Sequence, residues 1–362
     1  MKFTKSDTAY MELALSLSQR GFGKTQPNPM VGCVIVKHGK IIGQGYHQKC
    51  GGAHAEVNAL KNCKTNPKDA TVYVTLDPCN HVGKTGRCTE ALMQAGVKHV
   101  MSATDDPHDK KHEGEKLLKK NGISFRRGLL SDESRLILQP YLKWVSKKLP
   151  YVILKVATTL DGKIATVNGV SRGITSDASL KEVHRLRANV DAILTGSGTA
   201  LQDNPHLGVR YTKGIDPLRI LLDSSLSTPA NSLMFRDENC IVYTTYQAPK
   251  NRIQTLESKG IEVVTMGSSI ELLTVMKDLF ARGVYLLLIE AGSSVMTSFL
   301  NEKLVDRYVQ FIAPKLLGGE DSLTGFEGEN PVDFYKVVGL KNVEWKQFGE
   351  DMRVEGVYRI YS

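Results

Sequence analysis

The sequence of 362 residues is poor in aromatic residues and has no long apolar run. Phe, Trp and Tyr together make up 7% of it, with two tryptophans. No stretch approaches the roughly 20 apolar residues that a membrane-spanning helix needs. With 41% hydrophobic and 23% charged residues, the composition is that of a globular protein, which excludes disordered, collagen-like and disulfide-rich miniprotein classes. The length favours two domains.

Cysteine is scarce and unevenly distributed. Five of the six cysteines and seven of the nine histidines precede residue 113. The apolar stretch 10–17 is interrupted by Glu12 and Ser16 and lacks the cleavage pattern of a secretory signal. We therefore expect a cytoplasmic protein, in which clustered Cys and His residues indicate metal or thiol chemistry rather than a disulfide framework.

Charge is also uneven along the chain. Residues 1–148 carry 24 basic and 13 acidic side chains, a net charge of +11, whereas residues 149–362 carry 23 and 25, a net charge of −2. A basic half attracts an anionic partner, which is either nucleic acid or a phosphorylated small molecule. Charge alone does not choose between them.

Two successive α/β patterns predict the domain organisation. The first contains these expected elements: a helix over 7–20, a hairpin over 31–47, a helix from 51, a strand over 70–76, a helix over 90–95 and a strand over 97–103. The proline-bounded segment 140–150 is predicted to be a linker. The second pattern runs from a strand at 151–157 to a strand at 308–313. We expect domains over 1–146 and 149–362, each with parallel strands covered by helices.

The sharpest motif is His54-Ala-Glu56 followed by Pro78-Cys79 and, after eight intervening residues, Cys88. One imidazole and two thiolates supply three ligands of a tetrahedral Zn²⁺ and leave the fourth position for water, as in catalytic zinc sites. Such a zinc lowers the pKa of bound water to roughly 7. Glu56 is close enough to carry protons from the water to the substrate and to departing ammonia. This layout is typical of zinc nucleobase deaminases.

A structural zinc site is the alternative for the same ligands. It would need a fourth protein ligand, which His81 or His47 could supply. The four remaining cysteines are interpreted as inert or packed thiols: Cys33, Cys50, Cys63 and Cys240.

Signals in the second half are weaker. A strand over 284–290 runs into Ala291-Gly292-Ser293-Ser294 and then a helix, and backbone N–H groups at a helix start can hold a phosphate. The turn 195–200 also follows a strand, but its Gly-x-Gly alone is a weak signal of dinucleotide binding. Arg187 and Arg210 suit bidentate phosphate binding, although an isolated arginine is most often a surface charge.

Six segments together resemble one known family, the bifunctional deaminase–reductases of riboflavin biosynthesis (the RibD family). They are TQPNPMVGCVIV (25–36), GGAHAE (51–56), TLDPCNHVGKTGRC (75–88), TLDGKIA (159–165), GITS (173–176) and APKLLGG (313–319). The resemblance covers nearly the whole chain, and the eight-residue spacing between the cysteines is the family's own. It implies an α/β fold: an N-terminal cytidine-deaminase-like three-layer α/β/α domain, then a C-terminal dihydrofolate-reductase-like α/β domain.

Two consecutive reactions follow from the resemblance, with Zn²⁺ and NADPH as cofactors. The first is hydrolytic deamination of 2,5-diamino-6-ribosylamino-4(3H)-pyrimidinone 5′-phosphate. The second reduces the ribosyl side chain to give 5-amino-6-(5-phospho-D-ribitylamino)uracil. A phosphorylated pyrimidine ribosylamine accounts for the basic half without a nucleic-acid or membrane partner. Family membership also suggests a homo-oligomer.

Site residues are assigned from the resemblance position by position. It makes Glu56 catalytic and His54, Cys79 and Cys88 zinc ligands. Its substrate contacts fall on Asn28, His47, His81, Lys84, Lys155, Ser171, Arg187, Leu207, Arg210 and Glu290. Its NADPH contacts fall on Ala157, Gly173, Thr199, Asp203, Ser224, Gly292, Ser293, Ser294, Val295, Met296, Thr297 and Ser298. The family commonly has an aromatic residue where this chain has Gly173, so that this contact is left to the backbone.

Two other functions are compatible with parts of the pattern. A nucleic-acid-binding or editing protein would use the basic half to hold RNA near the zinc, but the sequence has no run of interleaved aromatic and basic residues. A chain with an inactive deaminase scaffold and a working reductase is disfavoured by the intact ligands and by Glu56.

Overall fold

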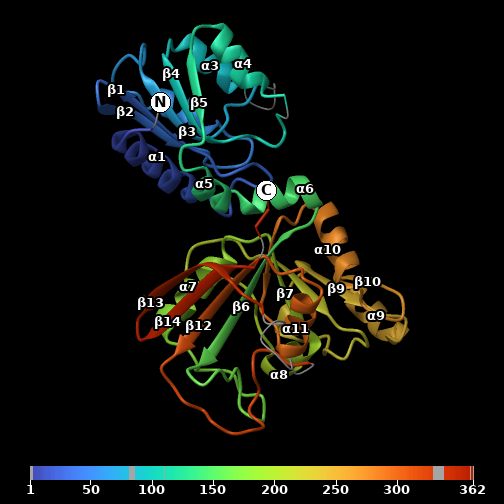
Figure 1. The fold of residues 1–362 in the computed structure, drawn as a ribbon. Helices are drawn as coiled ribbons and strands as arrows, with labels where there is room; N and C mark the ends of the chain where they lie inside the picture. Colours follow the sequence, from blue (N-terminus) through green and yellow to red (C-terminus); the bar gives the residue numbers. More distant parts are fainter. Residues whose placement is uncertain (1–2, 81–85, 110, 329–337, 359, 362) are drawn as a thin grey trace. The chain divides into compact units, whose positions relative to one another are not determined.

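The computed structural model describes residues 3–80, 86–109, 111–328, 338–358 and 360–361 (Figure 1). The chain divides into two compact units, Met1–Lys148 with Tyr361–Ser362, and Leu149–Ile360. Each unit has its own sheet. Among the described residues, no helix is long and apolar enough to cross a membrane.

The first unit contains a five-stranded sheet in the order β2-β1-β3-β4-β5. Strand β1 pairs antiparallel with β2 and β3, whereas β3, β4 and β5 are mutually parallel. The strands are β1 (Gly32–Lys37), β2 (Lys40–Tyr46), β3 (Thr71–Leu76), β4 (His99–Thr104) and β5 (Ser124–Arg127). The hairpin and the alternation of strands and helices predicted from the sequence are present.

Helices cover both faces of this sheet, which makes three layers (Figure 1). An apolar core lies on each face of the sheet, and alternate residues of β1 point into one or the other. Cys33 and Ile35 pack in the core with α2 and α3, and Val34 packs in the core with α1. The helices are α1 (Lys5–Ser18), α2 (Ala55–Lys61), α3 (Cys88–Gln94), α4 (Glu113–Lys120), α5 (Ser131–Ile137) and α6 (Gln139–Lys147).

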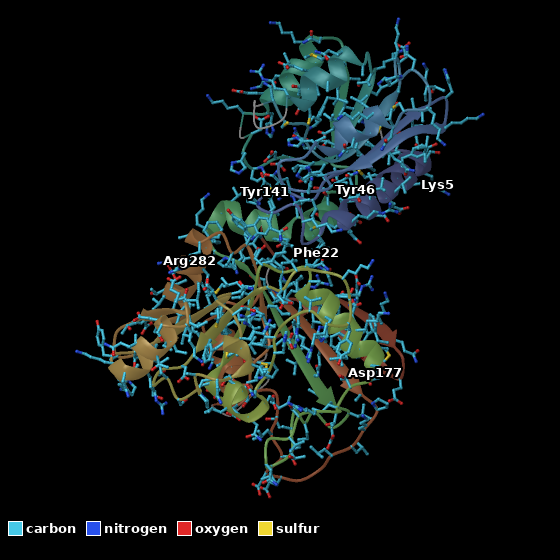
Figure 2. All side chains as sticks on the ribbon, turned by 180° about the vertical axis from the view of Figure 1, so that it is seen from behind. Lys5, Phe22, Tyr46, Tyr141, Asp177 and Arg282 are labelled. Carbon is cyan, nitrogen blue, oxygen red and sulfur yellow. The ribbon has the colours of Figure 1, made fainter. Side chains whose placement is uncertain are left out.

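The segment 140–150, predicted to be a linker, is instead mostly helical, because α6 continues to Lys147. Proline is tolerated in the first helical turn, where its missing N–H group has no intrahelical partner to lose. Tyr141, Leu142 and Trp144 are buried in this helix, and Figure 2 shows Tyr141 among the side chains of the first unit. The two prolines therefore mark a helix start and a strand start.

Helix α2 lies unusually close to β2. A Cβ atom on Gly45 would stand 2.4 Å from the backbone nitrogen of Ala59, and one on Gly43 would stand 2.5 Å from the carbonyl oxygen of Ala59. Real Cβ atoms do not make such contacts with backbone, so only glycine allows this approach. The approach fixes the helix whose N-cap is the predicted zinc ligand His54.

We expect Gly45→Ala to push α2 away from the sheet and to lower the free energy of unfolding of the first unit by about 1–3 kcal/mol. Zinc retention should fall with it. Urea unfolding and metal analysis of the purified protein measure both effects. Gly86→Ala is the matched control, because no atom of the described residues lies within 4 Å of a Cβ at Gly86. Equal stability of the two variants would contradict the packing argument.

The second unit contains a nine-stranded sheet in the order β10-β9-β8-β7-β11-β6-β12-β14-β13. The first seven strands in this order are parallel, and β14 and β13 are antiparallel to their neighbours. The strands are β6 (Tyr151–Thr159), β7 (Ala192–Gly196), β8 (Leu218–Leu222), β9 (Cys240–Thr244), β10 (Glu262–Thr265), β11 (Leu286–Ile289), β12 (Arg307–Ala313), β13 (Lys341–Phe348) and β14 (Asp351–Val357).

Strands β13 and β14 were not predicted from the sequence. Strand β13 forms the edge of the sheet and is exposed along nearly its whole length, so its residues show no apolar alternation. The helices of this unit are α7 (Asp177–Arg187), α8 (Ser197–Asp203), α9 (Lys250–Glu257), α10 (Leu272–Ala281) and α11 (Ser293–Asn301). Helices α10 and α11 bury apolar side chains in one core with the parallel strands.

Candidate active sites

Three side chains of the first unit form a group with metal-ligand geometry. The Nδ1 atom of His54 lies 3.2 Å from Sγ of Cys88 and 3.4 Å from Sγ of Cys79, and all three atoms lie within 4.8 Å of one another. Tetrahedral zinc bonds to nitrogen and sulfur set such atoms about 3.6 Å apart. The residues therefore fit a Zn²⁺ ion.

The group has three members among the residues that the structure describes. His47, the alternative fourth ligand, is not one of them, because both of its ring nitrogens have other partners. His81, the other alternative, lies outside the described residues, as does the predicted substrate contact Lys84. The described ligand set matches a zinc that keeps an open position for water.

Strand ends and helix starts position these ligands. His54 is the N-cap of α2, and Cys88 is the first residue of α3. Cys79 follows the end of β3, where Arg127 binds the carboxylate of Asp77 with Nε at 3.0 and 3.1 Å. Arg127 also donates to Glu115 at 2.8 Å. This partly buried ion-pair network fixes the loop that carries Cys79.

Charges and hydrogen bonds within the group shift the pKa values of Cys79 and Glu56. Hydrogen bonds from Cys88 and His54 lower the pKa of Cys79 to about 4, so that its thiolate is available as a ligand. Glu56 is 3% exposed, and burial together with the negative charge of Cys79 raises its pKa to about 7. A carboxyl group of this kind can both accept and release a proton near neutral pH.

Two predicted substrate contacts, Asn28 and His47, adjoin the zinc ligands. His47 is almost fully buried, its Nδ1 lies 3.1 Å from the carbonyl oxygen of Ala53, and its Nε2 lies 3.2 Å from Nδ2 of Asn28. Its ring stands edge-on to His54 with centroids 5.4 Å apart. Burial lowers the pKa of His47, which keeps the ring neutral.

Sequence reasoning missed Asn58, which holds the loop between β2 and α2 that precedes His54. Its Nδ2 donates to the carbonyl oxygens of Tyr46 at 2.8 Å and Ala53 at 3.1 Å. Asn58 stands one helical turn after His54, a spacing that places both on the same face of α2, but no motif marks it in the sequence.

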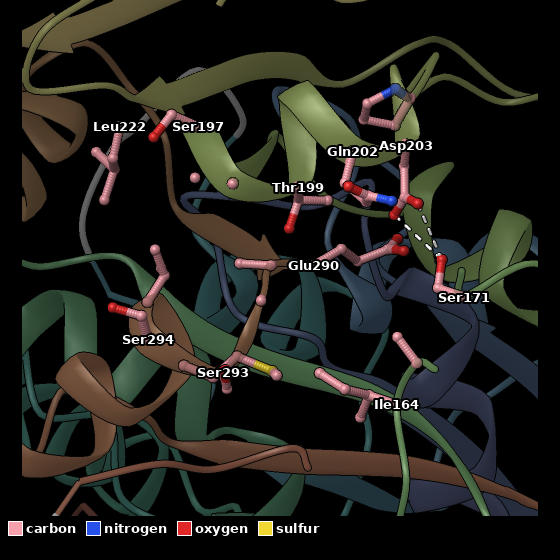
Figure 3. Close-up of a pocket in the computed structure, with 18 of the residues that line it drawn as sticks. Ile164, Ser171, Ser197, Thr199, Gln202, Asp203, Leu222, Glu290, Ser293 and Ser294 are labelled. Carbon is pink, nitrogen blue, oxygen red and sulfur yellow. Dashed lines mark hydrogen bonds between the residues drawn. The ribbon is translucent and has the colours of Figure 1, made fainter. Parts of the chain in front are cut away.

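The second unit has a cavity of 1510 Å³ at the carboxyl ends of its parallel strands (Figure 3). In open α/β sheets this edge is where ligands bind. Of the eighteen reductase residues predicted from the resemblance, seventeen line the cavity. The exception is Thr297, whose Oγ1 accepts a hydrogen bond from the backbone N–H of Glu327 at 2.9 Å.

A charged cluster lies in this cavity directly after β11. Arg187 donates through Nε and Nη2 to the two carboxylate oxygens of Glu290, at 2.8 and 2.9 Å, and Nζ of Lys155 lies 3.6 Å from the same carboxylate. Burial alone would raise the pKa of Glu290, but Arg187 and Lys155 outweigh it and hold that pKa at about 2. Burial lowers the pKa of Lys155.

Arg210 presents a different kind of charge to the cavity. It is exposed, its guanidinium stacks over the Tyr211 ring at 5.6 Å, and none of the described carboxylates pairs with it. A cation without an acidic partner attracts an anionic group of a ligand.

The first turn of α11 fits a dinucleotide phosphate. Its N-cap is Gly292, which offers no capping side chain, and the first N–H groups of a helix have no intrahelical partner. Ser293, Ser294 and Val295 line the cavity (Figure 3). Gly198 also lines the cavity, and no atom of the described residues lies within 4 Å of a Cβ built on it, so that a ligand can approach the backbone there. These features fit a bound NADPH.

Gly173 lines the same cavity in a left-handed conformation, with φ of +82°. Its carbonyl oxygen accepts a hydrogen bond from Nζ of Lys315 at 2.7 Å. A Cβ at this position would meet no atom of the part of the chain that the structure describes within 4 Å, but it would strain the backbone. Nearby, Ser171 donates to Asp203, as Figure 3 shows.

We expect Glu290→Gln to flatten the pH dependence of stability of the second unit. The pKa of Glu290 is lower in the folded protein, so its stabilisation is complete above the ordinary value of 4.5 and is lost as the pH falls toward 2. Between about pH 5 and pH 3, the free energy of unfolding of the wild type should therefore fall more steeply than that of Glu290→Gln. The difference in slope should be up to about 1 kcal/mol per pH unit. Urea unfolding at several pH values measures the slopes. Parallel slopes would contradict the pairing.

Two features define the class of protein. The first unit has zinc-ligand geometry beside a buried glutamate, and the second unit has a nucleotide-sized cavity on a parallel sheet. The protein is a two-domain enzyme with a zinc-dependent hydrolase site and a nucleotide-dependent oxidoreductase site. Comparison with known proteins gives the family. Residues 4–104 match the cytidine and deoxycytidylate deaminase zinc-binding region, and residues 150–354 match the RibD C-terminal domain. The chain belongs to the RibD family of riboflavin biosynthesis proteins.

Individual relatives match over nearly their whole length. Riboflavin biosynthesis protein RibD of Aquifex aeolicus is 39% identical over 96% of this chain and 97% of the relative. The Escherichia coli protein of the same name is 36% identical over 87% of this chain and 89% of its own. Among solved structures, Acinetobacter baumannii RibD superposes with a TM-score of 0.83 at 34% identity, covering 98% of this chain and 99% of that one.

A Thermotoga maritima structure is described as a diaminohydroxyphosphoribosylaminopyrimidine deaminase/5-amino-6-(5-phosphoribosylamino)uracil reductase. It superposes with a TM-score of 0.80 at 33% identity and covers 97% of this chain and 98% of that one. These findings confirm the predicted family and the fold class, a deaminase-like domain followed by a reductase domain. They also confirm a bifunctional deaminase and reductase with Zn²⁺ and NADPH as cofactors.

Proposed function

We propose that this chain carries out the two reactions named for the Thermotoga maritima relative, in that order. It hydrolyses the 2-amino group of 2,5-diamino-6-ribosylamino-4(3H)-pyrimidinone 5′-phosphate and then reduces the ribosyl group to ribityl with NADPH. The observation that carries the proposal is the group His54, Cys79 and Cys88 with buried Glu56 at its edge. A nucleotide-sized cavity in the second unit supports the reductase step.

In the deamination, His54, Cys79 and Cys88 would hold Zn²⁺, which would supply the Lewis acidity that makes water a nucleophile at neutral pH. Glu56 accepts a proton from this water and delivers it to a ring nitrogen, and then carries the remaining hydroxyl proton to the departing amine. A C–O bond forms at the amidine-like carbon, its C–N bond breaks, and ammonia leaves. Asn28 and His47, held together by their hydrogen bond, orient the pyrimidine.

In the reduction, the first turn of α11 binds the cofactor phosphates. When bound there, NADPH would be the source of the hydride that C1′ of the ring-opened imine form of the substrate requires. Lys155, whose ammonium pKa is lowered by burial, donates a proton to the imine nitrogen, so that a C–H and an N–H bond replace the C=N double bond. Glu290 and Arg187 hold Lys155 in place, and Arg210 binds the substrate phosphate.

Replacing Glu56 by Gln should abolish ammonia release while sparing zinc. The amide cannot accept the proton of the attacking water, whereas the three ligands are untouched. Ammonia release on the diaminopyrimidine substrate and zinc content measure the two effects. Reduction of the deaminated pyrimidine by the same variant is the internal control and should match the wild type. Normal deamination by Glu56→Gln would refute the assigned role.

Lys155→Met should slow NADPH oxidation on the deaminated pyrimidine by about 10²-fold or more, because it removes the proton donor. Deamination by the same variant should be unchanged. The matched control is Lys181→Met, which removes an exposed lysine of α7 that does not line the cavity. Wild-type oxidation rates in Lys155→Met would show that Lys155 is not the donor.

The proposal extends to the location, the assembly and the partners of the protein. We infer a cytoplasmic location from the six free cysteines, which suit a reducing compartment, and a homo-oligomer by analogy with the family. A phosphorylated substrate accounts for the basic first half without nucleic acid. The domain limits 1–146 and 149–362 also remain predictions, as do the roles of His81 and Lys84.

A further inference from the structure

Side chains of two neighbouring segments hold the short backbone stretch 207–211 at three successive residues. Nη1 of Arg187 donates to the carbonyl oxygen of Gly208 at 3.2 Å, and the N–H of Val209 donates to Oδ1 of Asp216 at 2.7 Å. The N–H of Arg210 donates to Nδ1 of His184 at 3.0 Å. The stretch is thus fixed by side-chain contacts outside any helix or strand.

The same stretch carries two residues that face the cavity, Leu207 and Arg210. Leu207 has a φ of +52°, a left-handed conformation that costs a non-glycine residue free energy and persists only where its surroundings impose it. The three contacts to residues 208–210 supply that constraint. They also determine where the Arg210 side chain leaves the backbone.

His184 has the properties of a specific acceptor in this arrangement. It is fully buried on α7, one turn before Arg187, so that both side chains lie on the same helix face. Because Nδ1 accepts the N–H of Arg210, the ring proton is on Nε2, which is buried and has no hydrogen-bond partner among the described residues.

The charges around His184 keep its ring neutral. Burial, Arg187 and Arg210 lower its pKa to about 4, with a smaller contribution from His206 and an opposing one from Glu290. The Tyr211 ring stands edge-on to the imidazole, with centroids 4.7 Å apart. A neutral imidazole is the form that can accept the Arg210 N–H bond.

We propose that His184 is the positioning residue of the reductase's substrate-phosphate subsite: its Nδ1 fixes the backbone of Arg210 and thereby aims the guanidinium at the phosphate. This inference rests on the proposed function, in which Arg210 binds that phosphate. The alternative is that His184 only fills space in the core. An apolar side chain of similar size distinguishes the two roles: it would preserve packing in the core but would remove the hydrogen-bond acceptor for the Arg210 N–H.

The experiment compares His184→Leu with His184→Asn. Leucine fills the space but removes the acceptor, which leaves the partly buried Arg210 N–H without its hydrogen-bond partner. Asparagine places an oxygen near the position of Nδ1 and can restore the bond. For each variant, reductase kcat and KM are measured for the deaminated pyrimidine phosphate, for the same compound without its phosphate, and for NADPH. Deamination by the same preparation reports the integrity of the first unit.

We expect His184→Leu to raise KM for the phosphorylated pyrimidine about tenfold and to leave KM for NADPH unchanged. The wild-type preference for the phosphorylated over the unphosphorylated compound should shrink by the same factor. His184→Asn should recover most of the loss. Val183→Ala is the matched control, because Val183 is the adjacent buried residue of α7 and does not line the cavity; it should lower stability without changing this preference.

Three results would overturn the proposal. His184→Leu could keep the wild-type preference for the phosphorylated compound, His184→Asn could behave as His184→Leu does, or Val183→Ala could reduce the preference equally. Failure of the proposed function is distinguishable, because the wild-type protein itself would then not oxidise NADPH with either pyrimidine.

Discussion

Both sites depend on one constraint: functional groups gather where a parallel strand ends and a helix begins. The ends of neighbouring parallel strands lie at the same edge of a sheet, and the N–H groups of a helix start lack intrahelical partners. In the first unit, β3 delivers Cys79, while His54 and Cys88 stand at the starts of α2 and α3. In the second unit, β11 delivers Glu290 just before α11.

The zinc group could be predicted from the sequence because its residues are separated by short, characteristic spacings. His54 and Glu56 are two residues apart, and the two cysteines flank a single loop. The charged cluster of the reductase could not be predicted in this way. Arg187 and Glu290 are separated by 103 residues, and only the pairing of β6 and β7 with β11 brings them together with Lys155. The family resemblance supplied these residues.

Other features escaped sequence reasoning for separate physical reasons. Prolines around 140–150 suggested a linker, but Pro140 starts α6, whose apolar residues are buried. Strand β13 is an exposed edge and carries little apolar pattern. His184 acts through a backbone N–H group 26 residues away, and neither its position nor its neighbours form a motif. Contacts to backbone leave almost no trace in sequence, because any residue can supply the backbone partner.

The central claim is that one chain deaminates first and reduces second. The most direct test mixes the purified, zinc-loaded protein with the diaminopyrimidine ribosylamine phosphate, with and without NADPH, and follows ammonia and the nicotinamide absorbance band together. The account predicts ammonia at the same rate in both mixtures, with NADPH oxidation that begins after a lag and ends at an equal amount. NADPH oxidation that precedes ammonia release, or the absence of both signals, would contradict it.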